Sequence, residues 1–205
     1  MKVFLIYKSI RKFLILINNF FDYIICYVIF WGNNVRYSSF NTRGIPYVSV
    51  AIGGKFSVNK NLSMNNGIIG NPIGCYDRCT FYVDNGASLE IGSNFGISQA
   101  AIICHSYIKI GNNVKIGGGA RIFDTDFHSL NPLLRINSIT DYVNKRKLPV
   151  IIEDNVFIGA HSTILKGVVI GQNSIVGACS VVTKSIPSNQ IWAGNPAKFI
   201  KYLNV

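Results

Sequence analysis

The sequence has few acidic side chains, few histidines and no paired-cysteine motif. Nine Asp and Glu residues stand against twenty Lys and Arg, which gives a net charge of +11 at pH 7. This excess favours an anionic partner, such as nucleic acid, anionic lipid or a phosphate-bearing small molecule. Nearly half of the residues are apolar and nineteen are glycine, which excludes a disordered or collagen-like chain. A length of 205 residues fits one domain with an appendage.

The cysteines form no CxxC pair, and no histidine stands at zinc-ligand spacing from them. Their odd number argues against a full disulfide framework and fits a reducing compartment. We therefore expect no metal site, and we expect five small buried apolar side chains: Cys26, Cys75, Cys79, Cys104 and Cys179. No recognised nucleic-acid-binding motif accompanies the basic charge, so we expect no nucleic-acid partner.

The first 31 residues differ from the rest. The run FLILINNFFDYIICYVIFW, residues 13–31, is long enough to cross a bilayer. Polar residues interrupt it and share one helical stripe with the upstream cations: Lys8, Arg11, Lys12, Asn18, Asn19 and Asp22. This spacing favours an amphipathic helix over residues 1–32 rather than a membrane-spanning one. The helix could pack on its own domain, on a partner subunit or on a membrane surface.

A six-residue repeat dominates the C-terminal half. Aliphatic residues recur at every sixth position: Ile152, Ile158, Ile164, Ile170, Val176 and Val182. A second set of inward candidates follows four residues after each: Val156, Ser162, Val168, Ser174, Ser180 and Ile186. In a helix, a step of six residues would scatter the aliphatic residues over three faces. In extended chain, positions i and i+4 share a face, but the intervening i+2 positions are polar or small. Each unit must therefore turn a corner, which predicts a parallel β-helix.

The same spacing continues upstream with one irregularity. Ile91, Ile97 and Ile103 keep it, and a slip of one residue then leads to Ile110, Ile116 and Ile122, with Phe95, Ala101, Val114 and Ala120 as the second inward set. The six-residue spacing is interrupted between Ile122 and Ile152, which predicts a protruding loop over residues 124–149. We assign 40–187 to the β-helix and 188–205 to a C-terminal tail.

With its repeat, loop and tail, the sequence resembles the hexapeptide-repeat acetyltransferases. The resemblance covers roughly residues 85–203 and is most specific in FDTDFHSLNP, residues 123–132, and in the segment from PVIIED to NPAKFIK, residues 149–201. The nearest branch contains the maltose and galactoside acetyltransferases and the O-acetyltransferases of bacterial surface polysaccharides. The resemblance implies an all-β left-handed parallel β-helix, acetyl-CoA as acyl donor with no metal, and a homotrimer with its site between neighbours.

Acetyl transfer to a hydroxyl needs a base, and histidine suits that task near neutral pH. By resemblance, His128 is the catalytic histidine. His161 stands at an outward position and is expected to be structural, whereas His105 has no assignment. Asp124 and Asp126 flank the base; either could orient its imidazole, hold a sugar hydroxyl or cap the turn that begins the loop. Asp126 is our substrate-contact candidate, together with Ser98.

The resemblance also implies a cofactor-binding set. It consists of Ala160 and Ala178 for the pantetheine arm, Thr183 and Lys184 near the phosphate end, and Lys198 in the tail, with Lys201 as a second basic candidate. Relatives often carry Trp where this chain has Phe157, so no N–H donor is expected at that position.

The sequence thus predicts an acetyl-CoA-dependent O-acetyltransferase that acts on a sugar or glycan hydroxyl. The expected setting is surface (capsular, O-antigen or exo-) polysaccharide biosynthesis in the cytoplasm, with membrane association at the inner face through residues 1–31. The alternatives are a xenobiotic or antibiotic acetyltransferase and a non-enzymatic binding solenoid. An amino-sugar N-acetyltransferase, a serine acetyltransferase and a β-helical carbonic anhydrase are less favoured.

Overall fold

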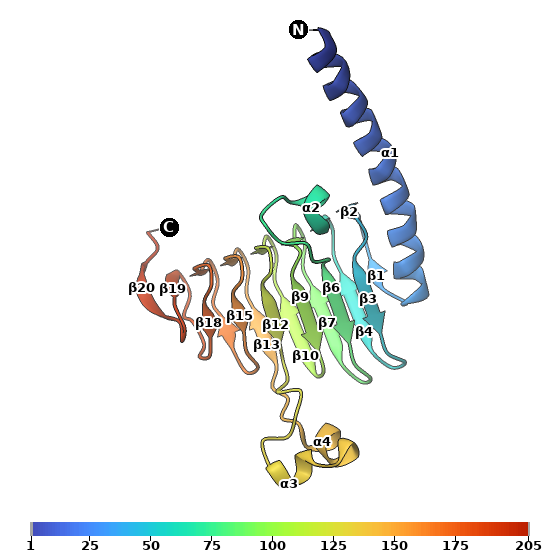
Figure 1. Cartoon of the computed structure of the whole chain (residues 1–205). Helices are drawn as coiled ribbons and strands as arrows, with labels where there is room; N and C mark the ends of the chain where they lie inside the picture. The colour runs from blue at the N-terminus through green and yellow to red at the C-terminus, as the bar shows by residue number, and fades with distance from the viewer. Residues whose placement is uncertain (1, 205) are drawn as a thin grey trace.

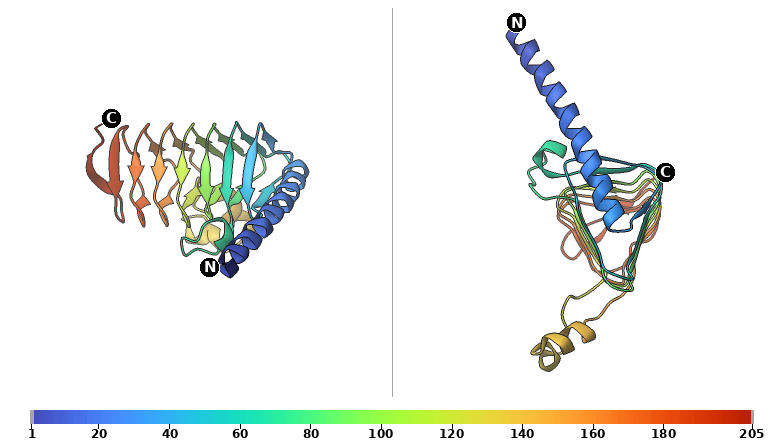
Figure 2. Two further views of the ribbon diagram at one scale, coloured as in Figure 1. Left: turned by 90° about the horizontal axis from the view of Figure 1, so that it is seen from above. Right: turned by 90° about the vertical axis from the view of Figure 1, so that its right-hand side faces the viewer.

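The computed structural model describes residues 2–204 and shows a triangular solenoid with a long helix at its N-terminal end (Figure 1). The helix, α1, spans Lys2–Gly32. A view along the solenoid shows the three faces and the loop that projects from one edge (Figure 2). Each face is a parallel sheet, because each strand pairs with the equivalent strands of the preceding and following coils.

The three sheets, named A, B and C, take one strand in turn from each coil. Sheet A consists of β1 (Arg36–Tyr37), β4 (Lys55–Val58), β7 (Ser88–Ile91), β10 (Tyr107–Ile110), β13 (Val150–Ile152) and β16 (Val169–Ile170). Sheet B consists of β2 (Phe40–Arg43), β5 (Leu62–Asn65), β8 (Gly96–Ser98), β11 (Lys115–Ile116), β14 (Phe157–Ile158), β17 (Ile175–Val176), β19 (Gln190–Ala193) and β20 (Lys198–Tyr202). Sheet C consists of β3 (Tyr47–Val50), β6 (Thr80–Val83), β9 (Ala101–Cys104), β12 (Arg121–Phe123), β15 (Thr163–Ile164) and β18 (Val181–Val182).

The inward positions of the C-terminal repeat form the core, as predicted. All six aliphatic positions and all six i+4 positions are buried. Buried serines among them satisfy their hydroxyls by bonding to backbone carbonyls: Ser162 Oγ donates to Gly177 O over 2.9 Å and Ser174 Oγ to Pro187 O over 2.7 Å. The core therefore accommodates these small polar residues without leaving their hydroxyl groups unbonded.

The position of the upstream slip was predicted incorrectly. Ala100 and Ile102 are buried, whereas Ala101 and Ile103 are only partly buried. The corner after Ile97 is one residue shorter than in later coils, and Gln99 turns it with a left-handed backbone (φ 44°). Ile97 to Ile102 spans five residues and Ile102 to Ile110 spans eight, so the single slip predicted after Ile103 combines a corner one residue short before β9 with a corner two residues long after it.

An asparagine ladder runs along the edge where sheet A passes to sheet B, named the AB edge. Each coil turns this corner with an asparagine at φ near +60°, a conformation that asparagine tolerates better than most residues. Each side-chain amide donates to the side-chain oxygen of the next asparagine over 2.7–2.9 Å, through the series Asn61, Asn94, Asn113, Asn155, Asn173 and Asn189. The ladder therefore fixes both the corner and the stacking of coils.

The two ends of the solenoid are closed differently. At the N-terminal end, Cys26 and Phe30 of α1 are fully buried, and Phe30 packs on Phe40 of β2 with ring centroids 5.0 Å apart. At the C-terminal end, β20 pairs with β19 in the antiparallel direction, and its residues are exposed. Sheet B therefore ends in a strand of reversed direction.

We predict that Asn113→Ala lowers the free energy of unfolding by about 1–2 kcal/mol, because alanine is strained at positive φ and breaks the ladder. Asn113→Gly should cost less, since glycine adopts this backbone freely. Denaturant unfolding of both variants and the wild type measures the difference. Equal stability of the alanine variant and the wild type would contradict a structural role for the ladder.

Candidate active site

The predicted loop projects from the edge where sheet C passes to sheet A, named the CA edge (Figure 1). Its two stems pair at Thr125 and Lys147, and Leu148 N donates to Asp124 O over 2.9 Å. The loop is more ordered than its sequence indicated, because it holds two short helices, α3 (Pro132–Arg135) and α4 (Ser138–Asn144). The side chain of Asn137 caps α4 by accepting from two backbone amides of its first turn.

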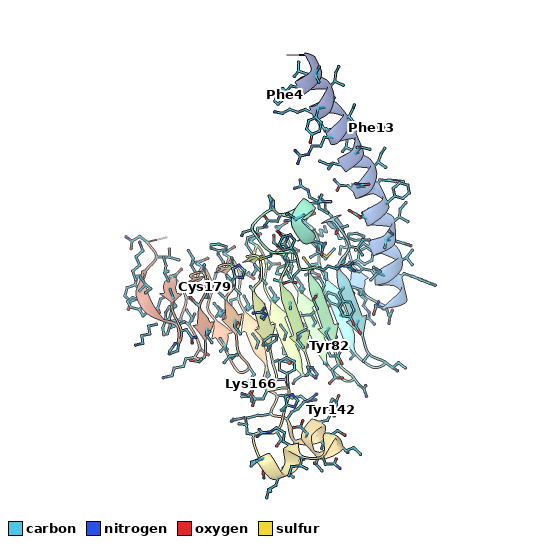
Figure 3. All side chains as sticks on the ribbon, viewed as in Figure 1. Phe4, Phe13, Tyr82, Tyr142, Lys166 and Cys179 are labelled. Atoms are coloured by element: carbon cyan, nitrogen blue, oxygen red, sulfur yellow. The ribbon has the colours of Figure 1, made fainter. Side chains whose placement is uncertain are left out.

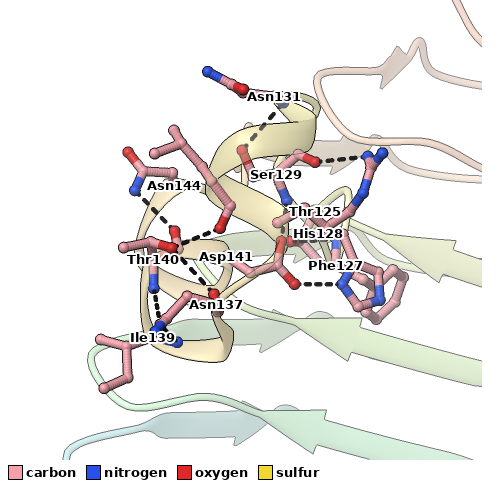
Figure 4. Close-up of polar contacts among 12 residues, drawn as sticks. Thr125, Phe127, His128, Ser129, Asn131, Asn137, Ile139, Thr140, Asp141 and Asn144 are labelled. Carbon is pink, nitrogen blue, oxygen red and sulfur yellow. Dashed lines mark hydrogen bonds and ion pairs between the residues drawn. The ribbon is translucent and has the colours of Figure 1, made fainter.

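His128 forms its side-chain bond with a residue that the sequence did not indicate. Its Nδ1 lies 2.7 Å from Asp141 Oδ2 on α4, and Ser129 N donates to Asp141 Oδ1 over 2.6 Å (Figure 4). These bonds, that of His128 foremost, lower the pKa of Asp141 below its usual value, so the carboxylate is an acceptor. Nδ1 must then be the donor, which leaves Nε2 as the basic nitrogen.

The residues next to His128 hold it on an exposed part of the loop. Its side chain is 68% exposed, so Nε2 is open to a substrate. Phe127 has a left-handed backbone (φ 64°), which is strained for a bulky residue. Such strain is characteristic of functional sites, where the surrounding contacts maintain it. Thr125 Oγ1 accepts from Phe127 N over 3.1 Å and supports the turn.

The two carboxylates predicted beside His128 bond elsewhere. Asp124 is fully buried and accepts from the backbone amides of His105 and Ser106, each over 2.7 Å. Asp124 thus caps the turn between β9 and β10 of the preceding coil rather than the turn that begins the loop. Asp126 forms an ion pair with Lys166 of the next coil. Asp141, rather than Asp124 or Asp126, is the carboxylate that bonds to the imidazole of His128.

His105, which the sequence left unassigned, belongs to a buried charged cluster at the base of the loop. Its Nδ1 lies 2.7 Å from Asp84 Oδ2 and 2.9 Å from Lys145 Nζ. Burial, and then the charge of Lys145, lower the pKa of His105. Burial likewise lowers the pKa of Lys145. Burial opposes ionisation of Asp84, yet hydrogen bonds from Tyr142, the Asn85 amide and His105 leave its pKa below the usual value.

The residues predicted to bind the pantetheine arm lie on the edge where sheet B passes to sheet C, named the BC edge. Ala160 and Ala178 stack in adjacent coils, and Cys179 N donates to Ala160 O over 2.8 Å. The coils approach so closely that a Cβ added to Gly159 would lie 2.8 Å from Ala178 Cα. Ala178 is exposed and Ala160 is partly exposed, so a ligand can reach the backbone of this edge.

The other predicted site residues are distributed over three places. Thr183 and Lys184 are exposed and follow β18, so they lie on the CA edge with the loop. Lys198 and Lys201 are exposed on β20. Ser98 is nearly buried on the BC edge, where its Oγ accepts from Asn65 Nδ2 over 3.2 Å. Phe157 is 47% exposed on the face of sheet B.

Within one chain, His128 and the pair Ala160 and Ala178 therefore lie on different edges of the triangle. The short helix α2 (Gly67–Gly70) marks the BC edge on the upper side of Figure 1, and the loop with α3 and α4 marks the CA edge on the lower side. A ligand that meets both groups must bridge two copies of the chain or extend around one face.

The prediction for the cysteines was wrong in one case. Cys26, Cys75, Cys79 and Cys104 are buried, but Cys179 is exposed because it occupies the outward left-handed corner (φ 58°) that follows Ala178. His161 holds the equivalent corner one coil earlier (φ 59°), and its Nε2 lies 3.6 Å from Cys75 Sγ. Within residues 2–204, no group of three His, Cys, Asp or Glu side chains is placed to hold a metal ion.

The chain is thus a triangular solenoid built from six-residue repeats, with a histidine–carboxylate pair on a projecting loop. Residues 149–184 match the family model described as the hexapeptide repeat of succinyl-transferase. Galactoside O-acetyltransferase of Escherichia coli (strain K12) is 37% identical over 124 residues, which make up 60% of this chain and 58% of that protein. The chain thus spans less than two thirds of this curated relative.

Solved structures of acetyltransferases are also similar to this chain. A hexapeptide-repeat acetyltransferase of Vibrio cholerae, complexed with acetyl coenzyme A, is 30% identical with a TM-score of 0.53, covering 62% of this chain and 64% of that one. A maltose O-acetyltransferase of Clostridium difficile is 28% identical with a TM-score of 0.52, covering 72% and 67%. The predicted left-handed β-helix fold and the resemblance to hexapeptide-repeat acetyltransferases are confirmed.

We predict that a thiol reagent modifies Cys179 of the folded protein far faster than the buried cysteines. Burial raises the pKa of Cys26 and of Cys104 to about 12 and that of Cys79 to about 11, so few thiolates form there. Mass spectrometry of peptides after brief maleimide treatment at pH 8 gives the order of labelling. Labelling of Cys104 as fast as Cys179 would show that the described core is wrong.

Proposed function

We propose that this chain is an acetyl-CoA-dependent O-acetyltransferase that acts on a sugar hydroxyl, with His128 as general base. The observation that supports it most is the bond between His128 Nδ1 and Asp141, because it leaves the basic Nε2 exposed. The relatives named as galactoside and maltose O-acetyltransferases supply the donor and the acceptor class.

The proposed reaction is a direct transfer. His128 Nε2 accepts the proton of the acceptor hydroxyl as the oxygen attacks the thioester carbonyl carbon. Asp141 stabilises the imidazolium that forms and keeps it oriented. The tetrahedral intermediate collapses, the C–S bond breaks, and His128 returns the proton to the departing CoA thiolate. The products are the acetyl ester and free CoA, and no other reactant is consumed.

We propose that the working unit is a homotrimer in which the loop of one copy meets the BC edge of a neighbour. The support is geometric, because His128 and the pair Ala160 and Ala178 lie on different edges of one chain. A lateral neighbour would bring its loop to that edge. In this arrangement Thr183, Lys184 and Lys198 offer cations for the phosphates of CoA, Asp126 and Ser98 remain the acceptor candidates, and Phe157 gives an apolar wall.

The N-terminal helix supports a further part of the proposal, which is contact with a membrane surface. Part of the polar stripe of α1 contacts the protein: Asp22 Oδ2 accepts from Gly44 N over 2.7 Å, and Asn18 lines a cavity shared with Ile68 and Ile69. The other sides of the helix are apolar and exposed, as Figure 3 shows for Phe4 and Phe13.

At its C-terminal end the helix buries Cys26 and Phe30 against the first coil, but most of its apolar side chains are exposed. Only 11% of the apolar window is buried, so the fold itself does not cover these side chains. The cations Lys8, Arg11 and Lys12 within the free part disfavour a spanning orientation and favour an anionic lipid surface. We infer association with the inner face of the membrane, where glycans on lipid carriers would be the natural acceptors in surface polysaccharide biosynthesis.

We predict that His128→Ala lowers kcat roughly 100-fold or more, whereas the affinity for acetyl-CoA measured by calorimetry stays within about twofold, because the base acts only in the chemical step. Release of thiol from acetyl-CoA is followed with a panel of sugars, oligosaccharides, amino sugars and antibiotics. Unchanged turnover in the variant would overturn the assignment of the base.

The same panel separates the alternatives. Turnover confined to antibiotic acceptors would favour a xenobiotic acetyltransferase. Binding of a glycan without thiol release from any acceptor would favour a non-enzymatic solenoid.

We predict that the full chain sediments with vesicles that contain anionic lipid, and that Phe4→Glu with Phe13→Glu abolishes sedimentation by removing apolar contact area. The matched control is Ile200→Glu with Tyr202→Glu, which makes the same charge change on exposed apolar residues at the opposite end. Sedimentation lost equally in both variants would mean that net charge alone binds the vesicles. No sedimentation of the wild type would overturn the membrane proposal.

A further inference from the structure

Helix α4 is held by two adjacent residues that point to different partners. Asp141 bonds to His128 and to the backbone of Ser129. Tyr142, the next residue, donates its hydroxyl to Asp84 Oδ2 over 2.7 Å. Figure 3 shows Tyr142 directed from the loop toward the coils, on the same side of the solenoid as Tyr82. The helix thus connects the candidate base to a carboxylate that belongs to the rigid solenoid.

Asp84 is suited to act as a fixed anchor. It follows β6 and is 5% exposed, and its Oδ1 accepts from Asn85 N over 2.9 Å. Its Oδ2 contacts His105 over 2.7 Å, and Lys145 Nζ lies 3.7 Å away. A buried carboxylate with several partners cannot change rotamer without losing all of them, and each lost bond of a buried charge is costly.

Lys145 holds the other end of α4 on the same anchor. It is the C-cap residue of the helix and is 5% exposed. Its Nζ lies 3.6 Å from the centroid of the Tyr142 ring and 2.9 Å from His105 Nδ1. The cation–π contact and the bond to Asp84 therefore act on one side chain, that of Tyr142, from two directions.

The remaining contacts of α4 cannot hold it in place. Within the described part of the chain, its exposed residues Ile139 and Val143 are more than two thirds exposed, and none of its residues is buried. A short helix without a buried face gains its position from specific polar contacts rather than from packing. The contacts that join α4 to the solenoid are those of Tyr142 and Lys145.

We propose that Asp84 and Tyr142 are positioning residues for the proposed reaction: by fixing α4 on the solenoid, they place Asp141 where it orients the imidazole of His128. The inference rests on the proposed function only for the role of His128 as base. The geometric connection from Asp84 to His128 can be tested without any substrate.

The test compares two tyrosine–carboxylate pairs on the same molecule. Tyr142→Phe removes the hydroxyl that bonds to Asp84. Tyr107→Phe is the matched control, because Tyr107 donates to Glu90 over 3.1 Å on the face of sheet A, outside the loop. Both changes delete a single oxygen atom from a partly exposed side chain, so both variants should fold, and thermal unfolding of each verifies this.

The first measurement is nitrogen NMR of the full chain labelled at histidine. The sequence has three histidines, so His128 is assigned by its loss in His128→Gln. The wild type and Tyr107→Phe should show His128 in one tautomer, with the proton on Nδ1. Tyr142→Phe should show an average of both tautomers. A His128 spectrum unchanged by Tyr142→Phe would overturn the proposal.

The second measurement is steady-state kinetics with acetyl-CoA and the best acceptor of the panel. We expect Tyr142→Phe to lower kcat by about tenfold, since misorientation of a base slows the chemical step, while KM for acetyl-CoA stays within about twofold. Asp84→Asn should reproduce the effect, and Glu90→Gln should not. A rise in acceptor KM with unchanged kcat would instead make the cluster an acceptor contact and contradict a positioning role.

The two proposals can fail separately. If His128→Ala keeps full turnover, the base assignment fails, yet the tautomer of His128 still reports whether Asp84 and Tyr142 position it. If the base assignment holds and the tautomer does not respond to Tyr142→Phe, only the positioning inference fails.

Discussion

The coils of this protein turn corners between three sheets, and many of these corners have a residue at positive φ. Asparagine occupies this position along the whole AB edge and uses its side chain to bond to the coil above and the coil below. The inward isoleucines can stack only when the corners repeat with the same length. The hydrophobic core thus depends on a row of exposed polar residues. In most globular domains, by contrast, the packing is set mainly by the buried apolar residues.

The same corners explain where function is located. A corner residue contributes little to the core, so a segment can be inserted there while the strands on either side keep their pairing. The loop of residues 124–149 interrupts the chain between β12 and β13, yet β13 still pairs with β10 in register from Val150 to Ile152. The loop is therefore free to carry His128, and the rigid coils supply its anchors in Asp84 and Asp124. The projecting loop that carries the histidine is thus tied to the coils at a few buried charges.

The sequence predicted the periodic part of the fold, but it did not predict contacts between residues outside the repeat. The repeat from Ile152 to Ile186 was sufficient to predict the fold, because the type of each residue indicates whether its side chain faces the core or the solvent. The register near Ile103 was predicted incorrectly, since the sequence does not reveal that Gln99 turns a corner one residue short and that the next corner is two residues long. The pair of His128 and Asp141 was missed because they lie thirteen positions apart in a segment without the six-residue repeat. Asn137, followed four residues later by Asp141, was a usable signal for a capped helix there. A helix over residues 1–32 was predicted, but only the structure shows that Asp22 contacts the coils while most of the apolar side chains are exposed.

The reversed strand β20 limits how this chain can assemble. A solenoid with open ends presents unpaired backbone groups that would template further copies, and an indefinite fibre would result. Here α1 covers the first coil, and β20 ends sheet B antiparallel with Lys198 and Lys201 on an exposed strand. The parallel order of sheet B is thus interrupted at β20. In the homotrimer proposed above, copies would associate side by side, so the number of subunits would be set by the angle between the faces and not by the length of the repeat.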